Sequence, residues 1–196
     1  MVRRGTRVTI LGAGDRRPLR DADGDGIPDA VDVLVGAKKT ALDAAPYVER
    51  YRSLRYPGGD VPRDEGVCSD VIVRALRNAG IDLQQEIHED AGRAPRAYPG
   101  IPRRNRDIDH RRVRNLVRWF ARHWKRVPAG AAEIPGDVVF IDTFPSKPGP
   151  DHVGVLSDVA GPSGRPMVIN SWTYGTRTSE MDLLAGWPVT DTFRAP

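Results

Sequence analysis

The sequence predicts an α+β domain in which helices come first and a small antiparallel sheet follows. Apolar residues recur at helical spacing up to residue 124, and after that point their period changes to two. The later apolar runs are short, rich in β-branched residues and separated by Gly and Pro turns. A chain of 196 residues accommodates one domain of this kind, with or without a short appendage.

The N-terminal part predicts an arm, residues 1–44, ahead of a main domain, residues 45–196. The arm contains a short predicted strand, Arg7 to Leu11, and an acidic loop at residues 21–32. A helical pattern follows from Val33 to about Leu54. Pro46 interrupts this pattern, so two shorter helices fit it as well as one.

Two amphipathic helices are expected within the main domain. The first spans Gly66 to Gly80, whose last glycine suits a helix C-terminus. The second spans Ile108 to Trp124, with apolar positions three or four residues apart on one face. The strands of the sheet are expected at Val138 to Asp142, Val153 to Leu156 and Met167 to Ile169.

Composition excludes some classes of protein. No apolar run approaches the roughly 18 residues needed to cross a bilayer, so we expect no membrane span. The apolar stretch Val8 to Leu11 is too short for a secretory leader. The Arg-rich segment from Arg103 to Arg126 raises the possibility of nucleic-acid binding, but no recognition motif accompanies its charges, which disfavours a nucleic-acid partner.

The single cysteine, Cys68, lies at the start of the helix expected from Gly66. A helix N-terminus stabilises a thiolate, and its free N–H groups suit an oxyanion hole. The alternative for a lone cysteine is burial as a small hydrophobe. Of the four histidines, His152 alone begins an expected core strand, and Asn170 ends the next strand, so this pair supplies a base and a group to orient it.

These segments carry a resemblance. The cysteine at a helix start, then PGDVVFID, HVGVL and a strand ending in a polar residue resemble the NlpC/p60 cell-wall peptidases. The stretches YPGGDVP, GVCSDVIVRALRNAGIDLQ, HED and NRDIDHRRVRNL resemble the bacterial domain of unknown function 1287. The resemblance covers roughly residues 45–194 and implies a papain-like fold with a triad of Cys68, His152 and Asn170. The sequence has NSW at Asn170 where His-Asn is expected in the closer family, so a neighbour of Asn170 could be the orienting residue.

Further residues are candidates for binding substrate. Tyr56 could donate to the oxyanion, or cover the core from a loop; Trp172 could shield the catalytic pair, as a tryptophan does in papain. Asp70 suits the first turn of its helix by charge, and is read as structural or substrate-orienting. His110 and Arg111 belong to a polar cluster that could bind a carboxylate of the substrate, or simply cap a helix and face solvent.

The acidic loop DADGDGIPDAVD has the spacing of an EF-hand calcium loop. It more closely resembles the loops of thrombospondin type 3 repeats, because no helix precedes it and its last ligand is Asp. The alternative is a solvated acidic turn. The expected ligands of a structural Ca²⁺ are Asp21, Asp23, Asp25, Ile27 through its carbonyl, Asp29 and Asp32.

The sequence therefore predicts a cysteine peptidase or amidase that needs no cofactor for catalysis. The expected substrate is a peptidoglycan stem peptide or a similar amide. Two alternatives stay open: a binding module on the same fold that does not cut its peptide, and a cysteine acyltransferase. The calcium loop favours an extracytoplasmic location, periplasmic or secreted. A delivered effector or a cytoplasmic protein remains the alternative, since the sequence shows no leader.

Overall fold

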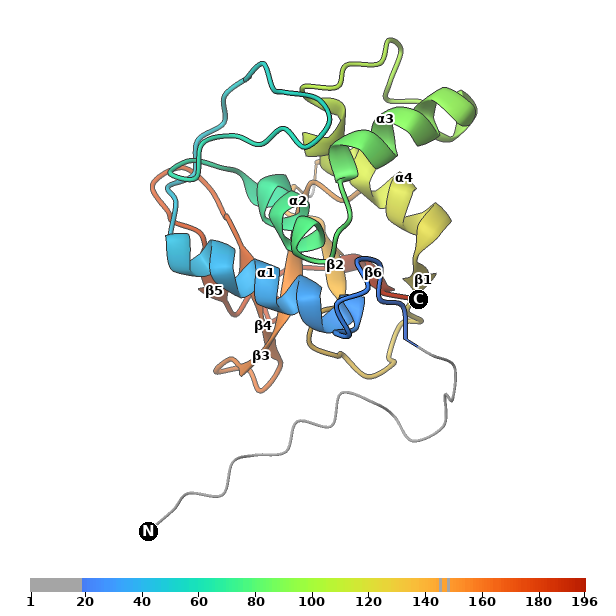
Figure 1. Cartoon of the computed structure of the whole chain (residues 1–196). Helices are drawn as coiled ribbons and strands as arrows, with labels where there is room; N and C mark the ends of the chain where they lie inside the picture. Colours follow the sequence, from blue (N-terminus) through green and yellow to red (C-terminus); the bar gives the residue numbers. More distant parts are fainter. Residues whose placement is uncertain (1–18, 145, 148) are drawn as a thin grey trace.

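The computed structural model describes residues 19–144, 146, 147 and 149–196, and the strand predicted at Arg7 to Leu11 lies outside them. The described chain is a mixed α+β fold in which helices pack on an antiparallel sheet, as the sequence predicted (Figure 1). No helix within the described residues is long and apolar enough to cross a membrane. The helices are α1 (Asp29–Asp43), α2 (Cys68–Asn78), α3 (Leu83–Arg93) and α4 (Val113–His123), with short 3-10 turns η1 (Pro95–Ala97) and η2 (Asp109–Arg111).

The sheet has six strands in the order β1-β6-β2-β3-β4-β5, and every neighbouring pair is antiparallel. Its centre consists of the three strands that the sequence predicted. The three strands that the sequence did not predict are short or half-exposed and lie toward the edges. The strands are β1 (Lys125–Arg126), β2 (Val138–Ile141), β3 (His152–Ala160), β4 (Pro166–Asn170), β5 (Ser179–Met181) and β6 (Val189–Arg194).

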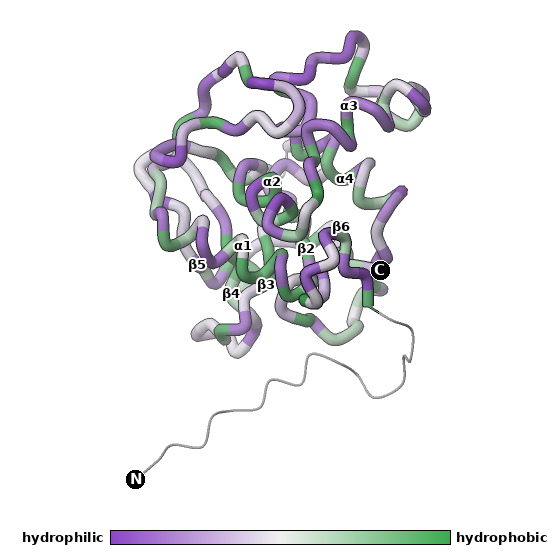
Figure 2. Tube along the Cα trace, in the orientation of Figure 1, coloured by the Kyte–Doolittle hydropathy of each residue, from purple (hydrophilic) through white to green (hydrophobic). Residues whose placement is uncertain are grey.

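Both faces of the central strands are covered, which explains their nearly continuous apolar sequences. One face packs with α1, α2 and α4 in the main hydrophobic core, which contains Phe120, Phe140 and Ile72. The other face packs beneath the segment around Leu183 and Leu184. Figure 2 shows the apolar residues gathered where the helices meet the sheet, and a largely hydrophilic loop beside α3.

Helix α1 differs from its prediction at both ends. It begins at Asp29 and ends at Asp43, because Ala44 adopts a left-handed conformation and Pro46 follows. Residues 49–55 are not helical. The helix packs closely on α2: a Cβ at Gly36 would lie only 2.9 Å from Cα of Ala75.

Two other helices also depart from the prediction. The expected helix from Ile108 to Trp124 is divided in two, because Arg112 is extended (φ −105°, ψ 119°) between η2 and α4. Helix α3 was not predicted at all. It begins at an N-cap, Asp82, whose side chain accepts from the N–H of Gln84. The buried Gln84 amide in turn holds the loop before α2, through Gly59 and the carbonyl of Arg55.

Candidate active site

Cys68 is the first residue of α2 and is 7% exposed. The helix begins there because Val67 is extended and its N–H donates to Asp70 Oδ2 at 2.8 Å. This bond satisfies a donor at the helix end, and the N–H of Ser69 in the first turn lies near the thiol. Local sequence thus sets the cysteine at a helix N-terminus, as predicted.

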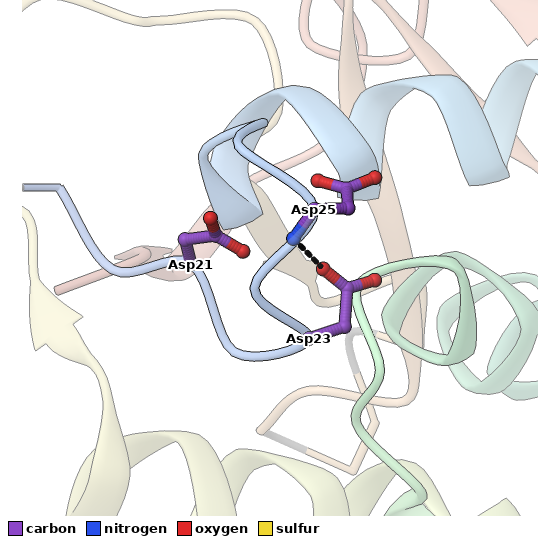
Figure 3. Close-up of side chains that lie close together, drawn as sticks. All are labelled: Asp21, Asp23 and Asp25. Carbon is purple, nitrogen blue, oxygen red and sulfur yellow. Dashed lines mark hydrogen bonds between the residues drawn. The ribbon is translucent and has the colours of Figure 1, made fainter.

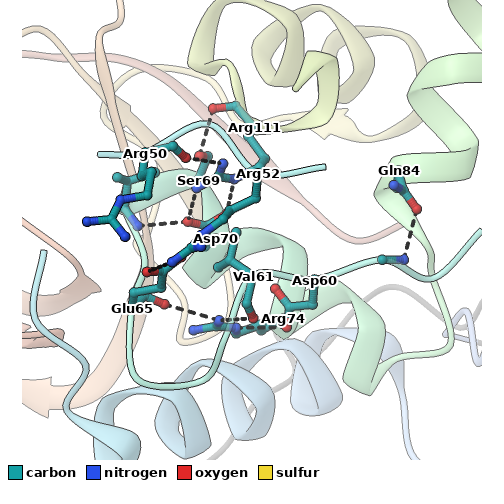
Figure 4. A network of polar contacts seen from close by, with 12 residues as sticks. Arg50, Arg52, Asp60, Val61, Glu65, Ser69, Asp70, Arg74, Gln84 and Arg111 are labelled. Atoms are coloured by element: carbon teal, nitrogen blue, oxygen red, sulfur yellow. Dashed lines mark hydrogen bonds and ion pairs between the residues drawn. The ribbon is translucent and has the colours of Figure 1, made fainter. Parts of the chain in front are cut away.

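Asp70 and Arg111 form a buried ion pair that fixes this end of α2 (Figure 4). The guanidinium binds both carboxylate oxygens, at 2.7 and 2.9 Å, and a third nitrogen donates to the carbonyl of Arg50. Ser69 Oγ donates to the carbonyl of Arg111 at 2.8 Å. The pair therefore joins α2 to η2 and to the loop near residue 50, so both residues position the cysteine.

His152 and Asn170 lie side by side on neighbouring strands, and both are buried. His152 is the first residue of β3, Asn170 the last of β4, and Nε2 lies 3.1 Å from Oδ1. The Asn170 amide nitrogen donates to the carbonyl of Val168, so its oxygen faces the imidazole. Nε2 of His152 therefore carries the proton, which leaves the lone pair on Nδ1 as the base.

Two neighbours hold this pair in place. The ring of Trp172 packs edge to face on His152, with ring centroids 4.8 Å apart. Trp172 also packs against the ring of Trp187. Gly154 allows β3 and β4 to approach, since a Cβ there would lie 2.3 Å from Val168 Cγ1 and 3.3 Å from Asn170 Cβ. The strand pairing that sets the histidine against the asparagine thus requires a glycine at this position.

Cys68 is brought to the histidine strand by the packing of α2 on β3. The backbone N–H of Val153, which follows His152, lies near enough to the thiol sulfur to lower its pKa. A cavity of about 540 Å³ opens over Cys68. It is large enough for a small ligand or a few residues of a peptide. Its lining combines the cysteine with Tyr47, Asp151 and several arginines.

Burial controls the protonation of the pair. Burial raises the pKa of the Cys68 thiol to about 12, although the N–H groups of Val153 and Ser69 lower it. Burial lowers the pKa of His152 to about 4, against the hydrogen bond with Asn170. Both groups are therefore neutral near pH 7. At the start of α2, desolvation of the thiol therefore outweighs the two N–H groups that lower its pKa.

Other predicted site residues lie elsewhere. Tyr56 packs against the ring of His88 and beneath the guanidinium of Arg106, away from the cavity over Cys68. His110 is buried, and burial lowers its pKa to about 4. Arg111 does line the cavity, but its guanidinium is engaged by Asp70.

Sequence reasoning missed Tyr47 and Asp151. Tyr47 lines the cavity beside Cys68 and packs edge-on against Tyr174. Burial raises the pKa of Tyr47, and the nearby thiol of Cys68 raises it further. The expected helix had covered Tyr47, whereas the structure bridges it to Gly66, two residues before the cysteine. Pro46 was the available signal, since a proline breaks a helix interior and keeps the residue before it out of the helical conformation. Asp151 was signalled by its place next to the histidine.

The acidic loop lies at the other end of α2. A Cβ at Gly80, just after this helix, would lie 2.7 Å from Asp23 Cβ. One carboxylate oxygen from each of Asp21, Asp23 and Asp25 lies within 4.8 Å of the others (Figure 3). Ile27 is exposed, and Asp29 and Asp32 are buried at the start of α1. The structure thus gathers these predicted metal ligands in one region, apart from the cysteine.

Comparison with known sequences identifies relatives over most of the chain. The sequence profile of the family described as Domain of unknown function (DUF1287) matches residues 34–195. "Uncharacterized protein YijF" of Escherichia coli (strain K12) is 38% identical over 162 residues, which cover 81% of this chain and 78% of that protein.

Comparison with solved structures identifies the fold. NlpC1 from Trichomonas vaginalis matches with a TM-score of 0.51 at 19% identity, over 87% of this chain and 45% of its own. NlpC2 from the same organism matches with a TM-score of 0.51 at 18% identity, over 91% and 50%. The chain therefore spans about half the length of these two structures. The fold is papain-like, of the NlpC/p60 type, as the resemblance implied.

Proposed function

The chain belongs to the DUF1287 family, and on that premise we propose that it is a cysteine-dependent amide hydrolase. One observation carries the proposal. A cysteine at a helix N-terminus faces the strand of a buried histidine, whose Nε2 is held by an asparagine and whose Nδ1 is left as a base. This is the nucleophile, base and orienting group that acyl transfer needs.

The reaction begins from a neutral thiol and a neutral imidazole. As Sγ of Cys68 attacks the amide carbon, its proton passes to Nδ1 of His152, and the carbonyl oxygen becomes negative. The N–H groups of the first turn of α2 and the Tyr47 hydroxyl are the donors for that oxygen. The oxyanion role predicted for Tyr56 thus passes to Tyr47.

The second half of the reaction uses the same base. The imidazolium returns its proton to the leaving amine, the carbon–nitrogen bond breaks and a thioester remains on Cys68. His152 then takes a proton from water, which attacks the thioester and releases the acid. Asn170 keeps the ring oriented in both steps through Nε2. An amine acceptor in place of water would make the protein an acyltransferase.

Charge around the cavity indicates the class of substrate. Arg50, Arg112 and Arg114 line it and are exposed, beside the acids Glu49 and Asp151. Exposed guanidinium groups bind carboxylates through paired hydrogen bonds. A peptide that carries free carboxylates, such as a peptidoglycan stem peptide, fits this lining better than a neutral amide.

The test is digestion of purified peptidoglycan and of a panel of peptide amides, followed by mass spectrometry of the products. Wild type is expected to release new amino termini, and Cys68→Ala and His152→Ala to release none. His123→Gln is the matched control, because His123 is partly exposed and pairs with Asp90 outside the cavity. Peptide that binds wild type without turnover or a covalent adduct would instead indicate a binding module.

A further inference from the structure

The acidic segment, residues 21–32, contains buried carboxylate oxygens without a hydrogen-bond partner, and they lie in the first turn of α1. Asp32 is 4% exposed, and its Oδ2 accepts no hydrogen bond. Asp29 is 1% exposed; its Oδ2 also accepts none, although Arg20 lies 3.2 Å away. A buried carboxylate oxygen without a donor costs free energy unless a cation neutralises it.

The remaining contacts of Asp32 fix the direction of this carboxylate. Asn78, the last residue of α2, donates to both Oδ1 and the backbone carbonyl of Asp32, at 3.2 and 3.0 Å. Asn78 thus occupies Oδ1 of Asp32, whereas Oδ2 is left without a donor at the end of the acidic segment.

The exposed side of the loop supplies the other oxygens. The carboxylates of Asp21, Asp23 and Asp25 converge, with one oxygen of each within 4.8 Å of the others (Figure 3). Gly24 and Gly26 turn the chain between them with φ of +74° and +89°. All the candidate ligands are oxygens, which Ca²⁺ binds in less regular geometry than the small, rigidly octahedral Mg²⁺.

We propose that residues 21–32 bind one Ca²⁺ ion, with the buried Asp32 oxygen closing a site opened by the three converging carboxylates. The Ile27 carbonyl and Asp29, directly or through water, complete the oxygen shell. The ion would hold the loop against the start of α1 and the end of α2. The proposal is independent of the chemistry at Cys68, and nothing in its test depends on activity.

The first experiment is calorimetric titration of the 196-residue chain with CaCl₂ after treatment with EGTA and dialysis. We expect one saturable site with a dissociation constant of about 10⁻³ M or tighter. Asp23→Asn and Asp25→Asn should weaken binding at least about tenfold, because each removes one charged ligand. Asp43→Asn is the matched control and should bind Ca²⁺ as wild type does. It removes the same charge, but from an exposed acid at the far end of α1.

The second experiment distinguishes an ion ligand from a structural aspartate. In EGTA, Asp32→Asn should melt at or above the wild-type temperature, because one of five repelling charges is gone and Asn78 still has an acceptor. In saturating CaCl₂, wild type should gain about 5 °C and the variant clearly less. Lack of saturable binding, equal binding of Mg²⁺, or an Asp32→Asn effect of the same sign with and without Ca²⁺ would overturn the proposal.

Discussion

Asn170 Oδ1 and His152 Nε2 lie 3.1 Å apart, and neither residue is more than 5% exposed. We expect Asn170→Ala to lower kcat/KM roughly 10²-fold, because the imidazole loses the bond that orients it. Asn170→Asp should instead raise the pKa of His152, since a carboxylate favours the imidazolium. The acid limb of the pH profile would then move to higher pH. If both Asn170 variants have the wild-type pH profile of activity, Asn170 is only structural.

Alkylation of Cys68 should follow its raised pKa. Because burial raises the thiol pKa to about 12, the rate with iodoacetamide should climb steadily from about pH 7 to about pH 10. The measurement is the second-order rate by mass spectrometry, with denatured protein as the reference for an ordinary thiol. A rate that levels off below about pH 7 would indicate a thiolate–imidazolium pair at rest.

His110 makes folding sensitive to acid. Burial lowers its folded pKa to about 4, whereas the unfolded side chain titrates near 6.5, so the unfolded chain binds more protons between these values. Stability is therefore lost as the pH falls through this window, by about 2 kcal/mol between pH 7 and pH 5 for this residue. Urea unfolding of His110→Gln should show a smaller loss than wild type. His123→Gln serves as the partly exposed comparison.

Gly154 should not tolerate a methyl group. A Cβ there would lie 2.3 Å from Val168 Cγ1 and 2.8 Å from the Ile169 carbonyl, so β3 and β4 must separate. We expect Gly154→Ala to lower the free energy of unfolding by about 1–3 kcal/mol and to reduce activity with it. Gly186→Ala is the matched control, because nothing lies within 4 Å of a Cβ at that exposed position. Equal urea midpoints for the two variants would contradict this account.

Breaking the Asp70–Arg111 pair should cost far more unfolding free energy than breaking a surface ion pair. Its side chains are only 2% and 4% exposed, so Asp70→Asn leaves a buried guanidinium without its counter-charge. The expected cost is about 3 kcal/mol of unfolding free energy. Arg93→Gln, which breaks the exposed pair with Glu89, should cost less than about 1 kcal/mol. Urea denaturation at one pH measures the unfolding free energy of both variants.

Much of the fold could be predicted because buried helices and strands have a clear periodic pattern of apolar residues. Helix α2 and strands β2 to β4 lie in the core, and their patterns reflect it. Helix α3 has few apolar residues and is defined instead by its N-cap at Asp82, a local signal that an apolar pattern does not contain. The edge strand β1 is two exposed residues, Lys125 and Arg126, that pair only with β6.

The candidate site divides in the same way. Cys68, His152 and Asn170 were identifiable because each begins or ends a core element. Tyr47 was not, since its approach to Cys68 depends on the bridge to Gly66 across a loop, a contact that no local pattern encodes. The protonation state also eluded sequence reasoning, because burial is a property of the packed fold.

The close crossing of α1 and α2 at Gly36 has a mechanical consequence. Helix α2 has Cys68 at its first residue and Asn78, which holds Asp32, at its last. Eleven helical residues extend about 16 Å and contain no hinge. The crossing at Gly36 lies nearer the end of α2 that contacts the acidic segment than the end that carries the thiol. Because the Asp70–Arg111 pair fixes the thiol end and Asn78 holds the other end to Asp32, the helix sets a constant distance between the nucleophile and the acidic segment.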